Sequence, residues 1–236
     1  MDYRIELPQL TATFPGCPPK EEILLLAGGR APAPDWLRIA AKNRPLWCID
    51  HGIDACFAAG LQPDRLIGDG DSADQNNWKK ARLLGIPIDQ FPPAKDLTDT
   101  QLALHFLQAE KPSASVFLSG AFGGRFDHAF SNMYSLTGLR EKGFSACAAD
   151  EHEVLFLLQG QEEIILETTK MPEVISLLPF SPQCQGVSIQ NVQWPLQEVI
   201  LSSSLPYAIS NELLALNKPC RISLKNGCLG VYLHWK

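Results

Sequence analysis

The sequence predicts an α/β fold with an open, mostly parallel sheet, followed by a C-terminal all-β sandwich. Up to about residue 150, short apolar runs alternate with helical stretches, which is typical of an open α/β sheet. Beyond that point, short β-type runs are separated by Gly, Pro, Asn and Ser, with no helical stretch between them. Aspartate usage changes at the same place, because thirteen aspartates lie between Asp2 and Asp150 and residues 151–236 contain eight glutamates and no aspartate. We therefore expect an irregular N-terminal segment (1–21), an α/β domain (22–150) and a β-sandwich domain (151–236).

In the α/β domain, each expected strand is an apolar run. The run at 22–27 has the pattern of a strand buried on both faces, and Gly28 and Gly29 follow it as a turn where backbone could approach a ligand. Further strands are expected at 45–49, 66–67, 86–91 and 115–118. Helices are expected at 34–41, 52–59 and 73–84; a fourth begins at 98, and a fifth follows the glycine loop and ends at about 142. Thr98 and Gln101 match a capping box, which puts Asp99 at a helix N-terminus.

The second domain is expected to contain seven strands. They correspond to residues 154–158, 163–167, 174–178, 186–189, 199–201, 221–224 and 228–233. Runs of this length and spacing favour a sandwich over a helical domain. The polar stretch from Ala208 to Glu212 reads as a hairpin loop between two of them.

Composition excludes several classes of protein. The chain has 236 residues, is 45% hydrophobic and 19% charged, and carries a formal net charge of −6, so neither a nucleic-acid nor an anionic-membrane partner is expected. Seven scattered cysteines form no C-x-x-C pair and no zinc-ligand spacing, which indicates reduced, mostly buried thiols. The N-terminus lacks the layout of a signal peptide, and the first long apolar run is too short to span a bilayer. We expect a soluble, cytoplasmic protein.

Acidic side chains gather at the ends of the expected parallel strands, where ligands bind in open α/β sheets. Asp69 and Asp71 follow one strand at positions i and i+2, so both carboxylates lie on one side of extended chain. The acids at strand ends or in the loops after them are Asp50, Asp69, Asp71, Asp96, Asp99 and Asp127, with Lys95 and Arg125 among them. Carboxylates suit Mg²⁺, while cations and glycine amides suit phosphate, so this pattern predicts a magnesium–nucleotide site. The sequence contains no P-loop motif, and no G-x-G-x-x-G follows the first strand.

Three motifs in this order resemble the thiamin pyrophosphokinase (thiamine diphosphokinase) family. They are Gly68-Asp69-x-Asp71-Ser72, Lys95-Asp96-x-Thr98-Asp99-Thr100 and Gly123-Gly124-Arg125-x-Asp127-His128. In the second half, Ser176 to Pro179, Gly186-Val187, Trp194-Pro195-Leu196 and Ser210-Asn211-Glu212 resemble that family's thiamin-binding domain. The likeness extends over about residues 22–234. The chain departs from the family pattern at Gly70, where a large apolar residue is usual, and at His51, where glycine is usual.

The resemblance implies a function and a division of labour. It implies that residues 22–150 form an ATP- and Mg²⁺-binding catalytic domain and residues 151–236 a thiamin-binding domain. The implied reaction is ATP + thiamine → AMP + thiamine diphosphate, carried out by a homodimer whose active sites lie between subunits. In family terms Asp69, Asp71, Asp96 and Asp99 hold metal, with Asp69, Asp71 and Asp99 catalytic; Lys95, Gly123, Gly124, Arg125, Asp127 and His128 bind the nucleotide; and Asp50, Ser210 and Asn211 lie near thiamine.

Several alternatives remain open from the residues alone. Either Asp71 or Asp99 could accept the proton of the attacking hydroxyl. A related pyrophosphokinase acting on another hydroxymethyl heterocycle, such as a pterin, would use the same metal site. A catalytically silent nucleotide- or thiamine-binding homologue would keep the fold, and a phosphatase with Asp69 as nucleophile would keep the D-x-D pair.

Overall fold

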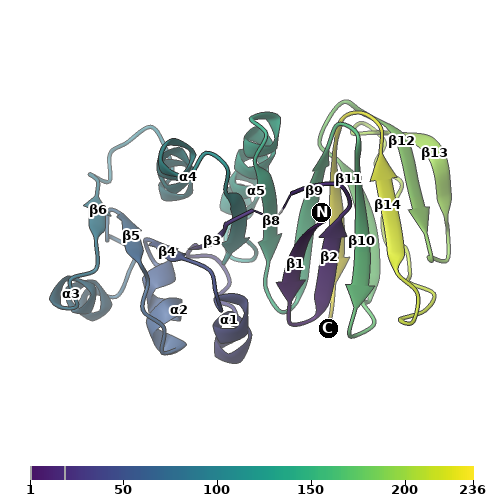
Figure 1. The fold of residues 1–236 in the computed structure, drawn as a ribbon. Helices are drawn as coiled ribbons and strands as arrows, with labels where there is room; N and C mark the ends of the chain where they lie inside the picture. The colour runs from purple at the N-terminus through teal and green to yellow at the C-terminus, as the bar shows by residue number, and fades with distance from the viewer. Residues whose placement is uncertain (1, 19) are drawn as a thin grey trace. The chain divides into compact units, whose positions relative to one another are not determined.

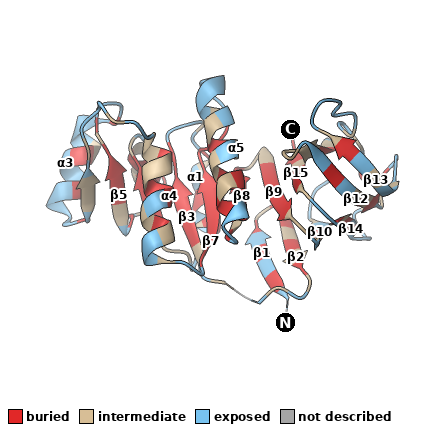
Figure 2. Ribbon diagram, turned by 90° about the horizontal axis from the view of Figure 1, so that it is seen from above, coloured by how far each residue is buried: buried red, intermediate tan, exposed pale blue. Residues whose placement is uncertain are grey.

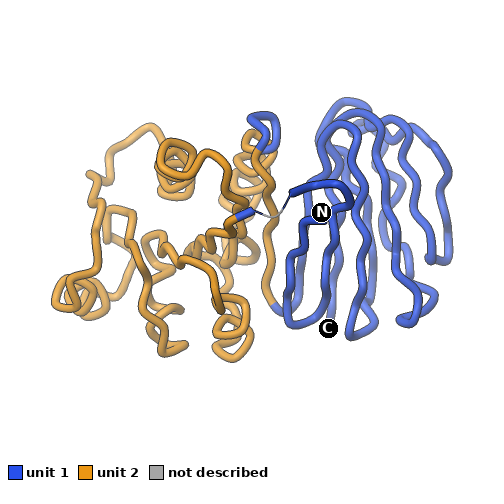
Figure 3. The backbone as a smooth tube through the Cα atoms, viewed as in Figure 1, with its two compact units in different colours: residues 1–20, 140–143, 151–236 blue, residues 21–139, 144–150 orange. Residues whose placement is uncertain are grey.

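The computed structural model describes residues 2–18 and 20–236 and divides the chain into two compact units (Figure 3). Unit 1 consists of residues 1–20, 140–143 and 151–236, and unit 2 of residues 21–139 and 144–150. Each unit has its own buried apolar core (Figure 2). Within the described part of the chain, no helix combines the length and the apolar character needed to cross a membrane.

Unit 2 is built on a parallel sheet. Its strands are β3 (Glu22–Leu26), β4 (Leu46–Ile49), β5 (Arg65–Gly68), β6 (Ile88–Gln90), β7 (Ser115–Ser119) and β8 (Ser145–Ala149), in the spatial order β8-β7-β3-β4-β5-β6. Every pairing between neighbours in this series is parallel. Because the strands are parallel, the loops that follow them emerge at one edge of the sheet.

Helices cover both faces of this sheet. They are α1 (Pro34–Ala40), α2 (Gly52–Ala58), α3 (Gln75–Leu83), α4 (Asp99–Glu110) and α5 (Phe126–Glu141). The helices α1 to α3 lie on one face, and α4 and α5 on the other (Figure 1). This explains why β3, β4 and β7 are buried along nearly their whole length: both faces are covered. The expected α/β architecture is confirmed.

Local sequence determines where the helices beside the functional loops begin. Thr98 accepts a hydrogen bond from Gln101 N, and the Gln101 side chain accepts one from Thr98 N, so the expected capping box starts α4. Asp74 caps α3 by accepting from Asn76 N at 2.7 Å. Asp99 is therefore the first residue of α4, and its position is fixed by the cap.

The strands of unit 1 pair antiparallel and belong to two sheets. One has the order β1-β2-β10-β14-β12-β13, and the other contains β11-β15-β9. The strands are β1 (Tyr3–Leu7), β2 (Leu10–Phe14), β9 (Glu153–Gln159), β10 (Glu162–Thr168), β11 (Val174–Pro179), β12 (Gln183–Gln190), β13 (Leu196–Ser202), β14 (Cys220–Leu224) and β15 (Cys228–His234). The rings of Phe14 on β2 and Phe156 on β9 meet edge to face, 6.1 Å apart, so the two sheets pack against each other. The β-rich second part is confirmed.

The expectation of an irregular segment at residues 1–21 is wrong. Strands β1 and β2 form an antiparallel hairpin, and β2 also pairs with β10. Alternate side chains of the hairpin are buried, including Tyr3, Ile5 and Phe14, as in a strand with one face on a core. The prolines of this segment indicated an irregular chain, but Pro8 is in the hairpin turn and Pro15 follows β2, so both lie outside the strands. Met1 and Pro19, which fall in the same segment, lie outside the described residues.

Candidate active site

A cavity of about 760 Å³ lies at the edge of the unit 2 sheet where the strands end. Asp50 follows β4, Asp69 and Asp71 follow β5, and the loop from Gly120 to Arg125 follows β7. The loop 93–98 and the start of α4 complete the lining. Of the residues predicted for a magnesium–nucleotide site, the structure places all except Asp127 along this one cavity.

Three carboxylates converge in the cavity. Oxygen atoms of Asp50, Asp69 and Asp99 lie within 4.8 Å of one another, although the residues follow β4, follow β5 and begin α4, respectively. Oδ1 of Asp99 is buried and forms an ion pair with Lys95 Nζ at 3.1 Å. Three carboxylate oxygens close together are the donor set that a hard divalent cation prefers. The residues present therefore fit Mg²⁺.

Lys95 lies against this carboxylate group. Its Nζ donates to Asp69 Oδ2 at 2.6 Å and lies 3.1 Å from Asp99 Oδ1. Burial would raise the pKa of Asp69, but the hydrogen bond from Lys95 and the amide of Asp71 hold it below its usual value. Burial likewise would lower the pKa of Lys95, and its hydrogen bonds to Asp69 and Asp99 raise it instead. Lys95 is thus a charged ammonium group inside the cavity.

The pKa values of Asp99 and Asp71 are raised, whereas that of Asp69 is lowered. Burial raises the pKa of Asp99, and repulsion by Asp69 and Asp50 adds to this, while Lys95 opposes it. Hydrogen bonding with Asp69, together with the charge of Asp69, raises the pKa of Asp71, whose side chain is exposed. Carboxylates with diverging pKa values in one cleft are typical of acid–base sites.

The predicted ligand set and the observed group differ in two respects. Asp71 and Asp96 line the cavity but are not part of the close group of oxygens, and Asp96 is exposed. Asp50, which the sequence placed near the organic substrate, belongs to that group. The signal for Asp50 was present, because β4 and β5 are neighbouring parallel strands and Asp50 and Asp69 follow them directly.

Asp50 connects the ends of β4 and β5. Its backbone is in the left-handed region with φ +44°, and its amide donates to Ile67 O at 2.8 Å. Its Oδ1 accepts from Gly70 N at 3.1 Å, and its Oδ2 accepts from the Ser72 hydroxyl. Asp50 therefore holds the D-x-D loop as well as lining the site.

The glycine loop after β7 is anchored to the loop after β3. Gly29 N donates to Gly120 O at 2.9 Å, and Arg30 N donates to Phe122 O at 2.6 Å. A Cβ at Gly29 would lie 2.4 Å from Gly120 O, so glycine is required there by the approach of backbone. Arg30 also pairs with the buried Asp150, at 2.6 Å between Nη2 and Oδ2, a link that sequence reasoning missed.

The residues after the glycine loop divide between the cavity and the surface. Arg125 and His128 line the cavity, and Arg125 is paired with Asp127 at 2.5 Å between Nη2 and Oδ2. This hydrogen bond lowers the pKa of Asp127, and both side chains are largely exposed. Asp127 is not among the described residues that line the cavity.

The predicted substrate residues Ser210 and Asn211 belong to unit 1. Asn211 lines a second cavity of about 290 Å³, together with Leu177, Trp194, Leu196, Tyr207, Ala208 and Ile209. Its side chain accepts from Trp194 N at 3.1 Å and donates to Trp194 O at 2.7 Å. Ser210 has φ +58° and its amide donates to Ser176 Oγ at 3.0 Å. Asn211 therefore fixes the backbone at Trp194, whose ring is exposed at this cavity.

Comparisons with known proteins agree on one family. The family model for the thiamin pyrophosphokinase catalytic domain matches residues 37–148, and the model for the thiamin pyrophosphokinase vitamin B1 binding domain matches residues 162–229. Thiamine pyrophosphokinase of Bacillus subtilis (strain 168) is 25% identical over 194 residues, covering 81% of this chain and 89% of its own length.

Solved structures show the same fold. The crystal structure of thiamine pyrophosphokinase from Bacillus subtilis has a TM-score of 0.79 at 23% identity, with 90% of this chain and 98% of that chain covered. Thiamin pyrophosphokinase from Geobacillus thermodenitrificans has a TM-score of 0.72 at 25% identity, with 91% and 98% covered. Because two models of one family match successive parts of the chain and the fold agrees over nearly its whole length, the chain belongs to the thiamin pyrophosphokinase family of transferases.

Proposed function

We propose that this protein transfers the diphosphoryl group of ATP to the hydroxyl of thiamine, giving thiamine diphosphate and AMP in a Mg²⁺-dependent reaction. The observation that carries the proposal is the convergence of Asp50, Asp69 and Asp99 beside Lys95 in one cavity. The cavity volume, about 760 Å³, is within the range of small-molecule and cofactor sites.

Mg²⁺ would be held by Asp50, Asp69 and Asp99, with Asp96 at the edge of the same cavity. When bound, it would neutralise charge on the phosphate oxygens and on the transferred group. The close approach of the three carboxylates supports this assignment, since the single positive charge of Lys95 does not balance three negative charges and a divalent cation would reduce their repulsion.

Cationic side chains and glycine amides would orient the triphosphate. Lys95 is inside the cavity, and Arg125 lines it from the end of the glycine loop. Gly123 and Gly124 have φ of +71° and +64°, a conformation that turns successive backbone amides toward one side. Arg125 is mostly exposed, so its guanidinium can exchange Asp127 for a phosphate at little cost.

Asp71 is the better of the two candidate bases. In the reaction the thiamine hydroxyl oxygen bonds to the β-phosphorus, the bond from that phosphorus to the α–β bridging oxygen breaks, and the hydroxyl proton passes to a carboxylate. The pKa of Asp71 is raised, its side chain is exposed to the cavity, and it is not part of the close carboxylate group. Asp99 is committed to Lys95 and to the group.

The second cavity would contribute to binding thiamine, which is a cation with a flat aromatic ring. Trp194 and Tyr207 are exposed aromatic side chains at this cavity, and aromatic faces attract such cations. Asn211 would act by holding Trp194, and Ser210 would lie beside it. As the family resemblance implies, we propose a homodimer in which the α/β unit of one subunit and the β unit of its partner serve one active site.

The activity is tested by incubating the protein with ATP, Mg²⁺ and thiamine and separating the products by chromatography. We expect equal amounts of AMP and thiamine diphosphate, and no product when EDTA is added. A parallel incubation with hydroxymethylpterin tests the alternative acceptor. Formation of ADP, of free phosphate, or of a pterin diphosphate in preference to thiamine diphosphate would contradict the proposal, and tight ATP binding without AMP release would indicate a silent homologue.

The homodimer is tested by mixing two inactive variants. Asp71→Asn alters unit 2 and Trp194→Ala alters unit 1, so each homodimer has both its sites impaired. A dimer that contains one subunit of each variant differs from them only if the units act across subunits. After unfolding and refolding of the two together, a mixed dimer has one intact site. Recovered activity supports the shared site, whereas a mixture as inactive as its parts, or a monomer in light scattering, contradicts it.

A further inference from the structure

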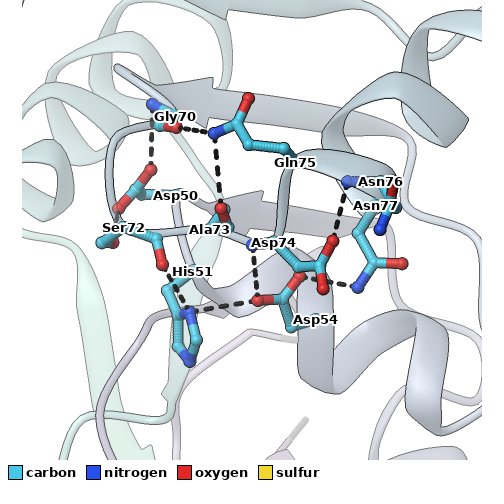
Figure 4. Close-up of polar contacts among 10 residues, drawn as sticks. All are labelled: Asp50, His51, Asp54, Gly70, Ser72, Ala73, Asp74, Gln75, Asn76 and Asn77. Carbon is cyan, nitrogen blue, oxygen red and sulfur yellow. Dashed lines mark hydrogen bonds and ion pairs between the residues drawn. The ribbon is translucent and has the colours of Figure 1, made fainter.

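The loop 70–74, which carries Asp71 and Ser72, is held in place by a network of hydrogen bonds from neighbouring side chains (Figure 4). Asp50 binds its first part, accepting from Gly70 N and from the Ser72 hydroxyl. Gln75 Nε2 donates to Gly70 O at 2.7 Å. These contacts restrain Gly70 on both sides, so the looser backbone that glycine implies at this position is not what the structure shows.

The end of the loop is held by one residue, Asp54 in the first turn of α2. Its Oδ2 accepts from Asp74 N at 3.0 Å and lies 3.1 Å from Nδ1 of His51. Its Oδ1 accepts from Asn77 Nδ2 at 2.7 Å. Both carboxylate oxygens are therefore used, and their partners come from the loop, from α3 and from the residue preceding α2 (Figure 4). The side chain of Asp54 is 20% exposed.

We propose that Asp54 is a positioning residue for the active site, which fixes the loop 70–74 and through it Asp71 and Ser72. This rests on the function proposed for the cavity. Asp54 is not among the described residues that line the cavity, so it acts only through the residues it holds. A hydrogen bond to an ionised acceptor is stronger than a neutral one, and Asp54 makes several in a partly buried position.

His51 takes part in the same arrangement. Its Nδ1 lies 3.1 Å from Ser72 O as well as from Asp54 Oδ2, so the ring bridges the loop and the Asp54 carboxylate. The ring is half exposed and also lines the cavity.

The proposal differs from the ordinary role of an acid in a first helical turn. Such an acid stabilises its own helix through the helix dipole. Asp35 in the first turn of α1 is such a residue, since it is 89% exposed and, within the described residues, its ion pair is with Arg38 on the same helix. Asp35→Ala is therefore a matched control for Asp54→Ala. Both variants lose an acid from a first helical turn, but only Asp54→Ala loses hydrogen bonds to the loop 70–74 and to α3.

The test uses Asp54→Ala, Asp54→Asn and the double variant Asp54→Asn/Asn77→Asp in the full-length protein. Asparagine has one acceptor oxygen, so when it accepts from Asp74 N its amide group meets the amide group of Asn77. In the double variant the amide of residue 54 donates to a carboxylate at residue 77, which restores the bond with its direction reversed and keeps the net charge. The measurements are hydrogen exchange of the amides of residues 70–74, Mn²⁺ affinity by electron paramagnetic resonance, and kcat and KM.

We expect Asp54→Ala to speed exchange in residues 70–74 by about tenfold or more. Because Gly70 and Ser72 of this loop donate to Asp50, one of the three proposed metal ligands, Mn²⁺ binding should weaken and kcat should fall by roughly 10- to 100-fold, the usual effect of losing an outer-shell partner. The KM for thiamine should change by less than about twofold, and the double variant should regain most of what Asp54→Asn loses. Unchanged exchange in Asp54→Ala, equal losses in Asp35→Ala, or no rescue in the double variant would each overturn the proposal. If Asp54→Ala does not fold, Asp54→Asn and the double variant decide. If the wild type forms no thiamine diphosphate, the proposed function fails, while exchange and Mn²⁺ binding still decide the role of Asp54.

Discussion

Nζ of Lys95 lies 2.6 Å from Oδ2 of Asp69, inside the carboxylate group that would hold Mg²⁺. The same ammonium group is 3.1 Å from Asp99 Oδ1. One lysine therefore compensates the charge of two of the three carboxylates in the metal-free protein. When a metal ion binds the carboxylates in place of Lys95, the ammonium group can pair with the phosphates of the nucleotide instead. The site therefore suits metal and nucleotide binding together.

Lys95→Gln should separate these two roles. Without the ammonium group the three carboxylates repel one another more strongly, so a divalent cation should bind several-fold more tightly in the absence of nucleotide. Turnover should fall by about 100-fold or more, because a charged donor to the phosphates is lost. Mn²⁺ titration and kcat measure the two effects. Lys111→Gln, which breaks an exposed pair with Glu21, is the control and should change neither; weaker Mn²⁺ binding in Lys95→Gln would contradict the interpretation.

Asp99→Asn should stabilise the metal-free protein and abolish its response to Mg²⁺. A carboxyl whose pKa is raised by folding favours the protonated state, so its contribution to stability is greatest below its unfolded pKa of about 3.9 and is lost as pH rises through the folded value. At pH 7 the neutral amide removes this penalty, which should raise Tm by about 2–4 °C, the shift that 1 kcal/mol gives in a protein of this size.

Thermal unfolding of wild type and Asp99→Asn, with and without Mg²⁺, at pH 7 and near pH 4 measures these effects. The advantage of Asp99→Asn should shrink as the pH falls toward 4, because a raised pKa means that a growing fraction of wild-type Asp99 becomes protonated there. Mg²⁺ should raise Tm of the wild type only, and less so at low pH, because protons compete for the ligands. A lower Tm at pH 7 or an intact Mg²⁺ response in Asp99→Asn would contradict the assignment.

Much of the α/β unit could be predicted because its signals are local. Expected strands and helices match β3 to β7 and α1 to α5 within a few residues, since most of the strands are apolar runs and the starts of α3 and α4 carry capping side chains. Strand β8 (Ser145–Ala149), with the sequence SACAA, was missed because small residues give no clear apolar run. The hairpin β1–β2 was missed although its alternation of buried and outward-facing residues is local, because the four prolines of residues 1–20 indicated an irregular segment.

The site was predictable as a set of strand ends but not as a geometry. The rule that ligands bind where parallel strands end brought Asp50, Asp69 and Asp99 into one group. It could not distinguish Asp50, which joins the close group, from Asp71, which does not, because that depends on the left-handed backbone at Asp50 and on which side chains bind amides. The role of Asp54 had no sequence signal, since its partners lie in a neighbouring loop and helix.

Thiol reactivity should single out Cys17. All seven cysteines are free, and only Cys17 is partly exposed. Burial raises the pKa of Cys220 and of Cys228 to about 12, and that of Cys147 well above its usual value, so these thiols are both shielded and protonated at pH 8. Ellman's reagent should therefore modify about one thiol quickly in the native protein and all seven in denaturant. Cys17→Ser should remove the fast reaction without altering Tm, and two or more fast thiols in the native protein would contradict the burial pattern.

Gly70→Ala should destabilise the protein by more than its backbone strain alone. Gly70 has φ +75°, and a Cβ there would lie 3.0 Å from the ring of Trp78, which is 3% exposed. The left-handed backbone costs a non-glycine residue about 1–2 kcal/mol, and moving a buried tryptophan ring adds to that cost. Gly85 has φ +69° with nothing within 4 Å of a Cβ, so Gly85→Ala measures the strain by itself.

Urea denaturation of both variants should show a larger loss of unfolding free energy for Gly70→Ala, by about 1 kcal/mol or more. Mn²⁺ binding should weaken only in that variant, because Gly70 N donates to Asp50. Equal losses would mean that the ring of Trp78 yields freely and that the loop is not held against α3.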